Sequence, residues 1–304
     1  MQTDPSETGD RQGLIAGLLC FTFWGLMPLL FRTAAHFGAA PLEIVAWRTL
    51  WSLPLAALLI VLIGRGGGLR ALFANPLDFR ALILSSLLIG TNWSVYVWAV
   101  NSGQTLSASL GYYINPLLNM LAGAMFFGER IDRRGHLAIG LATIGVAIQG
   151  AALGAFPWMA LLLGSSFCGY GVVRKQAKAD AQTGLFVECA ILCVPAFAYV
   201  LWLIHTGHSV FGTHLDVSLI LLFCGPATVL PLAAFSYAAR RLPLTIVGFL
   251  QFITPTIQFA IGIEEGETLT PLRALSFVFI WAGVAIFVFG ARRKPSVEPV
   301  LAVD

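Results

Sequence analysis

Ten runs of roughly 20 apolar residues recur along the 304-residue chain, and they constrain its fold more than any other feature. An α-helix of about 20 residues crosses a hydrocarbon core of about 30 Å. Because that core offers no water to backbone N–H and C=O groups, each run is expected to be helical. The mean hydropathy of +0.82 is far above that of a soluble domain. We therefore predict an all-α integral membrane protein with ten transmembrane helices, at residues 13–33, 41–64, 80–101, 105–127, 134–151, 155–174, 183–205, 217–239, 243–263 and 271–290.

The loops between these runs are short, so no soluble domain is expected. The predicted organisation is a tail at 1–12, a first five-helix unit at 13–151, a second at 152–290 and a second tail at 291–304. The first eleven residues hold three acids and one base, and no small-residue cleavage site follows the first apolar run. This is a poor match to a signal peptide, so the first run is expected to remain as a span.

Basic residues indicate the orientation, because Lys and Arg are retained on the cytoplasmic side during insertion. If the chain starts inside, fifteen of its eighteen Lys and Arg residues fall in cytoplasmic segments. Only Arg32 and Arg273 then lie outside, and Arg48 lies within a span. Both termini, and hence both tails, are therefore predicted to be cytoplasmic. The net charge of +3 reflects insertion, and no nucleic-acid partner is expected.

An internal repeat at a displacement of 138 to 139 residues divides the chain into two halves. The motif "GVAI" at 145–148 recurs at 283–286, and "GE" at 128–129 recurs at 266–267. Since each half holds five spans, the second half must enter the membrane upside down relative to the first. The equivalent loops "GERIDRR" and "EEGETLT" have opposite charge, as expected on opposite faces. Inverted repeats are typical of transporters that expose one site alternately to each side.

The equivalent spans 105–127 and 243–263 are polar at their middle, and each contains a proline there, Pro116 or Pro255. A proline frees the carbonyl four residues earlier and breaks or kinks the helix. We predict that the two polar arcs face each other across a central cavity and contact the substrate. The alternative is that they form ordinary interhelical hydrogen bonds and proline kinks. The substrate-binding candidates of the arcs are Ser109, Tyr112, Asn115 and Asn119, with Gln251, Thr254 and Gln258 in the second half.

Several further residues in the middle of spans are candidates for the cavity wall. Their aromatic rings suit a small amphipathic or aromatic solute, although deep aromatic side chains also serve simple packing. These substrate-binding candidates are Trp24, Asn92, Trp93, Tyr96, Tyr113 and Tyr170.

Ionisable residues inside the membrane are costly and are therefore functional candidates. Arg48, in the span at 41–64, either binds a substrate carboxylate or anchors the helix by reaching toward the outer surface. Glu188, in the equivalent span at 183–205, either carries a coupling proton or forms a structural pair near the cytoplasmic end. Glu43 lies near the outer boundary, where we expect it to be solvated or paired.

Motifs for other classes of protein are missing from the sequence. No GxxxxGK[ST], HExxH or GxSxG pattern occurs, so neither ATP-driven pumping nor a membrane enzyme is expected. No cofactor and no metal site are expected. All five cysteines fall inside spans, which indicates free, small apolar side chains rather than a disulfide framework.

Several motifs resemble those of the RarD branch of the EamA-domain family, within the drug/metabolite transporter superfamily. They are "FTFWGLMPLLFR", "GTNWSVYVWAVNSGQTLSASLGYYINPLLNMLAGAMFFGER", "GYGVVRK", "QTGLFVE" and "GFLQFITPTIQFAIG". The resemblance covers roughly residues 11–294, and the "GE" that ends each half is the broader EamA signature. A departure is Tyr113, where such proteins often have phenylalanine.

The resemblance implies ten spans in two EamA repeats, cytoplasmic termini and a central cavity. It also implies export of small metabolites or drugs across the bacterial inner membrane, with related branches moving amino acids. The resulting hypothesis is a secondary transporter working by alternating access. Its partners would be a small-molecule substrate, the lipid bilayer and, as a candidate coupling ion, protons; the chain would be a monomer or weak dimer. The alternative is a channel or a non-transporting binding component.

Overall fold

A computed structural model of the chain describes residues 5–63, 72, 75–128, 131, 133–177, 179–239, 241–242 and 250–291. These residues contain ten helices and no strand, which confirms the all-α prediction for this part of the chain. The helices are α1 (Pro5–His36), α2 (Pro41–Ile63), α4 (Pro76–Asn101), α5 (Thr105–Phe127), α6 (Arg133–Leu153), α7 (Trp158–Gln176), α8 (Ala181–His205), α9 (Leu215–Ala239), α11 (Ile253–Glu264) and α12 (Pro271–Ala291).

Each predicted span overlaps one of these helices, and α1 begins earlier than its apolar run, at Pro5. Six helices in the described part are long and apolar enough to cross a membrane by length and composition, namely α1, α2, α4, α6, α8 and α9. The chain is therefore a multi-pass membrane protein, whereas the count of ten spans stays a prediction. Most of the predicted C-terminal tail and residues 243–249 of the ninth predicted span lie outside the described residues.

Helices of the first half pack mainly against helices of the second half. α1 packs on α9 as α4 packs on α7, and α1 packs on α11 as α5 packs on α7. Equivalent helices also meet directly, since α2 contacts α8, α5 contacts α11 and α6 contacts α12. Exchanging the two halves maps each of these contacts onto itself or another of them, whereas contacts within the first half, such as that of α2 with α4, have no counterpart of similar extent among the described residues of the second.

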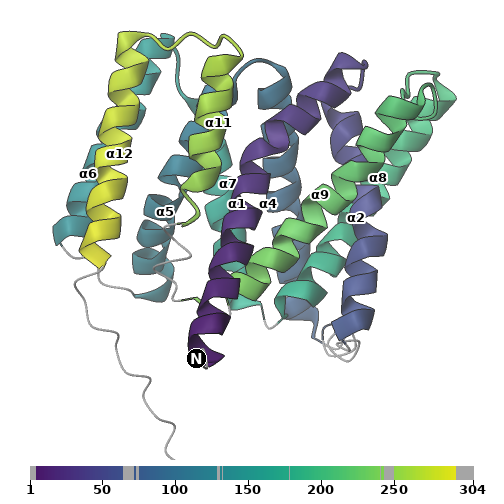
Figure 1. Ribbon diagram of the computed structural model, residues 1–304, viewed down its shortest axis with the longest axis horizontal. Coiled ribbons are helices and arrows are strands. Elements are labelled where there is room, and N and C mark those ends of the chain that lie inside the picture. Colours follow the sequence, from purple (N-terminus) through teal and green to yellow (C-terminus); the bar gives the residue numbers. More distant parts are fainter. Residues whose placement is uncertain are drawn as a thin grey trace, which may run out of the picture.

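α6 and α12 lie side by side at one edge of the bundle (Figure 1). A Cβ added to Gly145 of α6 would lie 2.8 Å from the backbone oxygen of Ser276. A Cβ added to Gly283 of α12 would lie 2.8 Å from the backbone oxygen of Ala138. The two glycines begin the two copies of "GVAI", so the repeated motif allows close approach of two helix backbones.

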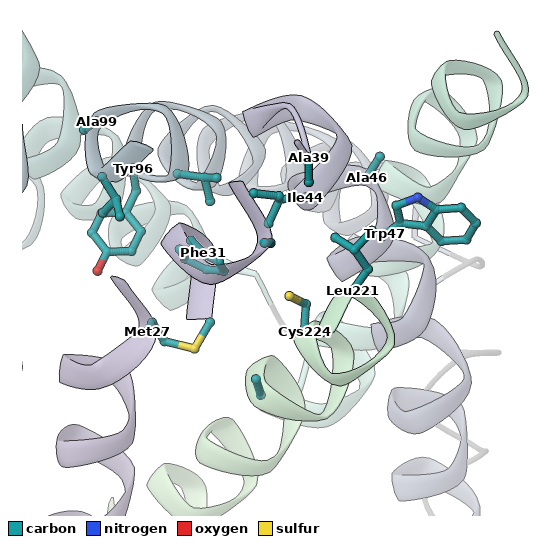
Figure 2. Packing of buried hydrophobic residues seen from close by; sticks show 14 of the residues in the cluster. Met27, Phe31, Ala39, Ile44, Ala46, Trp47, Tyr96, Ala99, Leu221 and Cys224 are labelled. Carbon is teal, nitrogen blue, oxygen red and sulfur yellow. The ribbon is translucent and has the colours of Figure 1, made fainter. Parts of the chain in front are cut away.

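A buried hydrophobic cluster joins α1, α2, α4 and α9 (Figure 2). Met27 and Phe31 of α1 pack there with Tyr96 of α4 and with Leu221 and Cys224 of α9. All five cysteines of the chain are free and buried, which confirms their prediction as apolar packing residues.

The two matched prolines occupy different places in their helices. Pro116 lies inside α5, which continues from Thr105 to Phe127. α11 begins only at Ile253, so Pro255 lies in its first turn. The N–H groups of a first turn have no intrahelical partner, and a proline there removes no hydrogen bond. The break predicted around Pro255 is therefore the start of a helix, and Gln251 precedes it in a turn.

Candidate functional site

A cavity with a volume of about 350 Å³ is lined by residues from both halves of the chain. This volume is in the range of small-molecule sites. The wall comes from α1, α2, α4, α5, α7, α8, α9 and α11, together with the turn before α11. The sequence-predicted residues that line it are Trp24, Arg48, Asn92, Trp93, Tyr96, Tyr112, Asn115, Pro116, Tyr170, Glu188, Gln251, Thr254, Pro255 and Gln258.

Three predicted residues of α5 lie outside this wall. Ser109 is buried, and its hydroxyl donates to the Leu106 carbonyl within the same helix at 2.8 Å. Tyr113 points toward α12, where its ring packs edge-on against Phe277, and its hydroxyl bonds Thr256 at 2.8 Å. Asn119 is exposed on the surface of the bundle. The periodicity of a helix predicts which residues share one face. The position of the neighbouring helices decides how many residues of that face reach the cavity.

The polar arc of the first half is hydrogen-bonded to α4. The Tyr112 hydroxyl donates to Asn92 Oδ1 at 3.0 Å. Asn92 Nδ2 in turn donates to the Leu163 carbonyl at 2.9 Å and to Ser166 Oγ at 3.0 Å, both on α7. This network fixes the Tyr112 ring in the cavity wall, because each buried polar atom that it uses has a partner.

The second arc is bonded in an equivalent way to the first half. Gln258 Nε2 donates to the Tyr96 hydroxyl at 2.7 Å, and the Thr254 hydroxyl donates to the Phe21 carbonyl at 2.8 Å. Two amide oxygens in the wall, Asn115 Oδ1 and Gln258 Oε1, are buried without a hydrogen-bond partner among the described residues. The arcs thus combine interhelical hydrogen bonds with a position on the cavity, so both interpretations of the sequence describe part of the geometry.

Arg48 is 94% buried, and its guanidinium reaches the cavity. Its Nε donates to Thr228 Oγ1 at 2.6 Å, and the guanidinium carbon lies 4.3 Å from the centre of the Trp93 ring. It forms no ion pair with a carboxylate in the described part of the chain. Arg48 therefore does not reach toward the surface as a helix anchor.

Glu188 belongs to a group of four residues that we call the Glu188 cluster. Its carboxylate accepts hydrogen bonds from Ser85 Oγ at 2.6 Å and from the Tyr170 hydroxyl at 3.2 Å. Arg174 Nε lies 3.5 Å from the same carboxylate. The cluster joins α4, α7 and α8, so the structural pair proposed from the sequence is present, and the coupling role stays a hypothesis.

A second group at the end of α1, the Arg32 cluster, was not singled out from the sequence. Arg32 lies 2.7 Å from the Glu265 carboxylate and 3.5 Å from that of Glu267, and it donates to Thr105 Oγ1 at 2.9 Å. Glu267 also accepts the backbone N–H groups of Thr105 and Leu106 at the start of α5. A carboxylate at a helix N-terminus satisfies free N–H groups and complements the helix dipole.

The Arg32 cluster explains the "GE" pair that follows α11 in the second half. Gly266 adopts a φ of 86°, which a residue with a side chain rarely adopts, and so ends the segment after α11. The next residue, Glu267, can then turn toward α5. Burial raises the pKa of Glu265 above its ordinary value, and the adjacent Arg32 guanidinium opposes this rise. The repeated "GE" was the signal in the sequence, whereas its partner on α5 was not predictable from spacing.

Glu43 differs from its expectation, because it is buried and has no cation beside it among the described residues. Its carboxylate accepts from the Ser209 hydroxyl at 2.8 Å and from the Val210 N–H at 3.0 Å, both in the loop between α8 and α9. The described residues contain no group of three or more His, Cys, Asp or Glu side chains that could hold a metal ion.

Several cavity residues were not identified from the sequence, including Phe21, Met27, Phe167 and Phe235. Their side chains are apolar like most of the chain, so nothing in the residue type separates a cavity wall from a lipid-facing surface.

Comparisons with known proteins agree with this architecture. The sequence profile of the EamA-like transporter family matches residues 11–150. A Vibrio cholerae relative, named only as an uncharacterized transporter, is 39% identical over 93% of this chain and 94% of its own length. RarD proteins of Streptomyces exfoliatus and Escherichia coli are 36% and 37% identical, over 95% and 92% of this chain and 91% and 95% of theirs.

The apolar helices, the family profile and the transporter relatives together define a multi-pass membrane transporter. The chain belongs to the EamA-like transporter family and, within it, to the RarD branch. A solved structure described only as a protein crystal structure shares the fold, with a TM-score of 0.58 and 17% identity over 92% of this chain and 98% of that one. Relatives from Vibrio cholerae and Bacillus subtilis are named as transporters and not as enzymes.

Proposed function

We propose that the protein is a secondary transporter that exports a small amphipathic solute, such as a metabolite or drug, across the bacterial inner membrane. In this proposal ten helices span the bilayer as two inverted five-helix repeats, 13–151 and 152–290, and both termini are cytoplasmic. The substrate binds in the central cavity between the arcs of α5 and α11. This cavity opens alternately to each side of the membrane. The set of helix contacts that survives exchange of the halves supports this arrangement.

The observation that carries the proposal is the asymmetry of the cavity along the bundle. At one end the Arg32 cluster ties α1, α5 and the segment after α11 together, five residues beyond the cavity-lining Met27. At the other end the cavity extends to Arg174 in the last turn of α7 and to Gln182 in the first turn of α8. By the predicted orientation, this is a conformer closed toward the outside.

Substrate counterflow in proteoliposomes tests the transport function. Asn115→Ala and Gln251→Ala each remove an amide from the cavity wall, so each should lower the transport efficiency by about 3- to 10-fold, the value of one hydrogen bond. Asn119→Ala is the matched control, because this side chain is exposed and outside the wall. Unchanged kinetics in both cavity variants would contradict the site. A flux that does not saturate would indicate a channel, and no flux would indicate a binding component.

A further inference from the structure

The charged residues of the cavity wall leave one cation without a counter-ion. Three charged side chains line the cavity within the described residues: Arg48, Arg174 and Glu188. Glu188 is already engaged by Arg174, Ser85 and Tyr170. Arg48 has no carboxylate beside it among the described residues, so the described wall carries a net formal charge of +1.

The position of the Arg48 guanidinium suits an incoming anion. Its Nε edge is held by Thr228, whose hydroxyl in turn donates to the Cys224 carbonyl at 2.9 Å. Its two terminal nitrogens make no hydrogen bond in the described part of the chain, and neither is fully enclosed by protein atoms. A guanidinium offers a planar pair of N–H donors that fits a carboxylate. An isolated cation at this depth is costly, and a bound anion would remove that cost.

Aromatic rings surround the same guanidinium. Trp93 and Phe31 lie 4.3 Å and 5.7 Å from it, measured from the ring centres to the guanidinium carbon. Tyr96 and Tyr112 meet edge-on at 5.4 Å between ring centres, and both line the cavity. A flat apolar group attached to the anion would therefore contact ring faces and edges, as aromatic groups prefer.

We propose that the cargo is an aromatic carboxylate without an amino group, and that its carboxylate binds the terminal nitrogens of Arg48. This inference rests on the proposed transport function and specifies its substrate class. An α-amino acid fits less well, because its ammonium group would lie near Arg48 and would find only the uncharged amide oxygens of Asn115 and Gln258 as free acceptors in the wall. The net charge of the wall thus selects a monoanion over a zwitterion or an amine.

Three ligands that differ only in their charged groups test this class: 3-phenylpropionate, phenylalanine and 2-phenylethylamine. Their binding to the purified full chain in detergent is measured by calorimetry. We expect 3-phenylpropionate to bind at least about 30-fold more tightly than phenylalanine, and 2-phenylethylamine to bind most weakly. Equal affinity for phenylalanine, or no binding of any of the three, would overturn the proposal.

Substitutions at Arg48 test the named contact. Arg48→Met keeps most of the side-chain length and should lower the affinity for 3-phenylpropionate by at least about 30-fold, abolishing the preference over phenylalanine. Arg48→Lys keeps the charge and should keep the preference for 3-phenylpropionate over phenylalanine. This variant allows the role of the charge to be measured if Arg48→Met does not fold. Asn119→Ala should behave as the unmodified protein. A preference for the carboxylate that persists in Arg48→Met would assign it to another residue.

Counterflow with labelled 3-phenylpropionate separates this proposal from the transport function. Binding with no flux would contradict transport and leave the ligand class intact. Saturable flux of phenylalanine or 2-phenylethylamine in preference to 3-phenylpropionate would contradict the ligand class and leave transport intact.

Discussion

The Arg32 cluster and the Glu188 cluster pair the same residue types at opposite ends of the cavity, but their surroundings differ. In the Arg32 cluster the arginine and Glu265 side chains are 26% and 20% exposed. In the Glu188 cluster the carboxylate is 1% exposed and is held by residues of α4 and α7. An ion pair near water is worth little and costs little to break, whereas a buried carboxylate without its partners is costly.

This difference indicates which end of the cavity can open. Breaking the Arg32 cluster exposes groups that water can solvate at once, apart from Glu267, whose side chain is 7% exposed. Breaking the Glu188 cluster requires the carboxylate to be protonated or to find another partner. The Arg32 cluster is therefore predicted to be a closure that breaks readily, whereas any rearrangement of the Glu188 cluster is linked to the charge of its carboxylate.

The largest effect is expected for Glu188→Ala. The change leaves Arg174 without its carboxylate and Ser85 and Tyr170 without an acceptor, so the free energy of unfolding should fall by about 3–5 kcal/mol. Unfolding in mixed micelles with a denaturing detergent measures this loss. Glu188→Gln keeps the hydrogen-bonding shape and should lose less, which makes it the variant for flux driven by a pH gradient. Full gradient-driven flux in Glu188→Gln would remove Glu188 from proton coupling.

A smaller effect is expected for Glu267→Ala, which removes a helix cap and one carboxylate of the Arg32 cluster. The loss of a cap costs about 0.5–2 kcal/mol. Because this contact exists only while that end is closed, the loss should also raise the population of outward-open molecules by about 2- to 30-fold. Labelling of a Met27→Cys variant by an impermeant thiol reagent from outside reports that population. Unchanged labelling would show that the Arg32 cluster does not control closure.

The smallest effect is expected for Glu265→Gln. Since burial raises the pKa of Glu265 despite the adjacent Arg32 guanidinium, the folded protein stabilises the charged carboxylate less than water does, and a neutral amide should be tolerated. The free energy of unfolding should change by less than about 0.5 kcal/mol. The same unfolding assay compares Glu265→Gln with Glu267→Gln, and an equal loss in both would contradict the division of roles within the Arg32 cluster.

The helices were predictable because apolar runs and short loops are local features of the sequence. The central arcs were also indicated, since Tyr112, Asn115, Gln251 and Thr254 stand out as polar residues in apolar surroundings. The direction in which each side chain points was less predictable. Tyr113, one residue from Tyr112, packs on α12, and only the position of α12 decides this.

Contacts between distant segments could not be derived from one sequence. The "GE" repeat was visible, but the contact of Glu267 with the start of α5 joins residues more than 160 positions apart. The place of Pro255 also required the structure, because the matched proline Pro116 lies inside a helix whereas Pro255 lies in the first turn of one. Spacing in the sequence predicts faces and repeats, whereas closure depends on how the helices meet.

The pair of α6 and α12 contributes no residue to the described cavity wall. Its glycine contacts bring the last helix of each half together, away from the solute. Among proteins of this fold that carry different solutes, the sequences of α6 and α12 should therefore be constrained only by contact with lipid and by helix packing. A directed-evolution library aimed at a new substrate can omit both helices, which removes two of the ten described helices from the search without loss of any contact to the cargo.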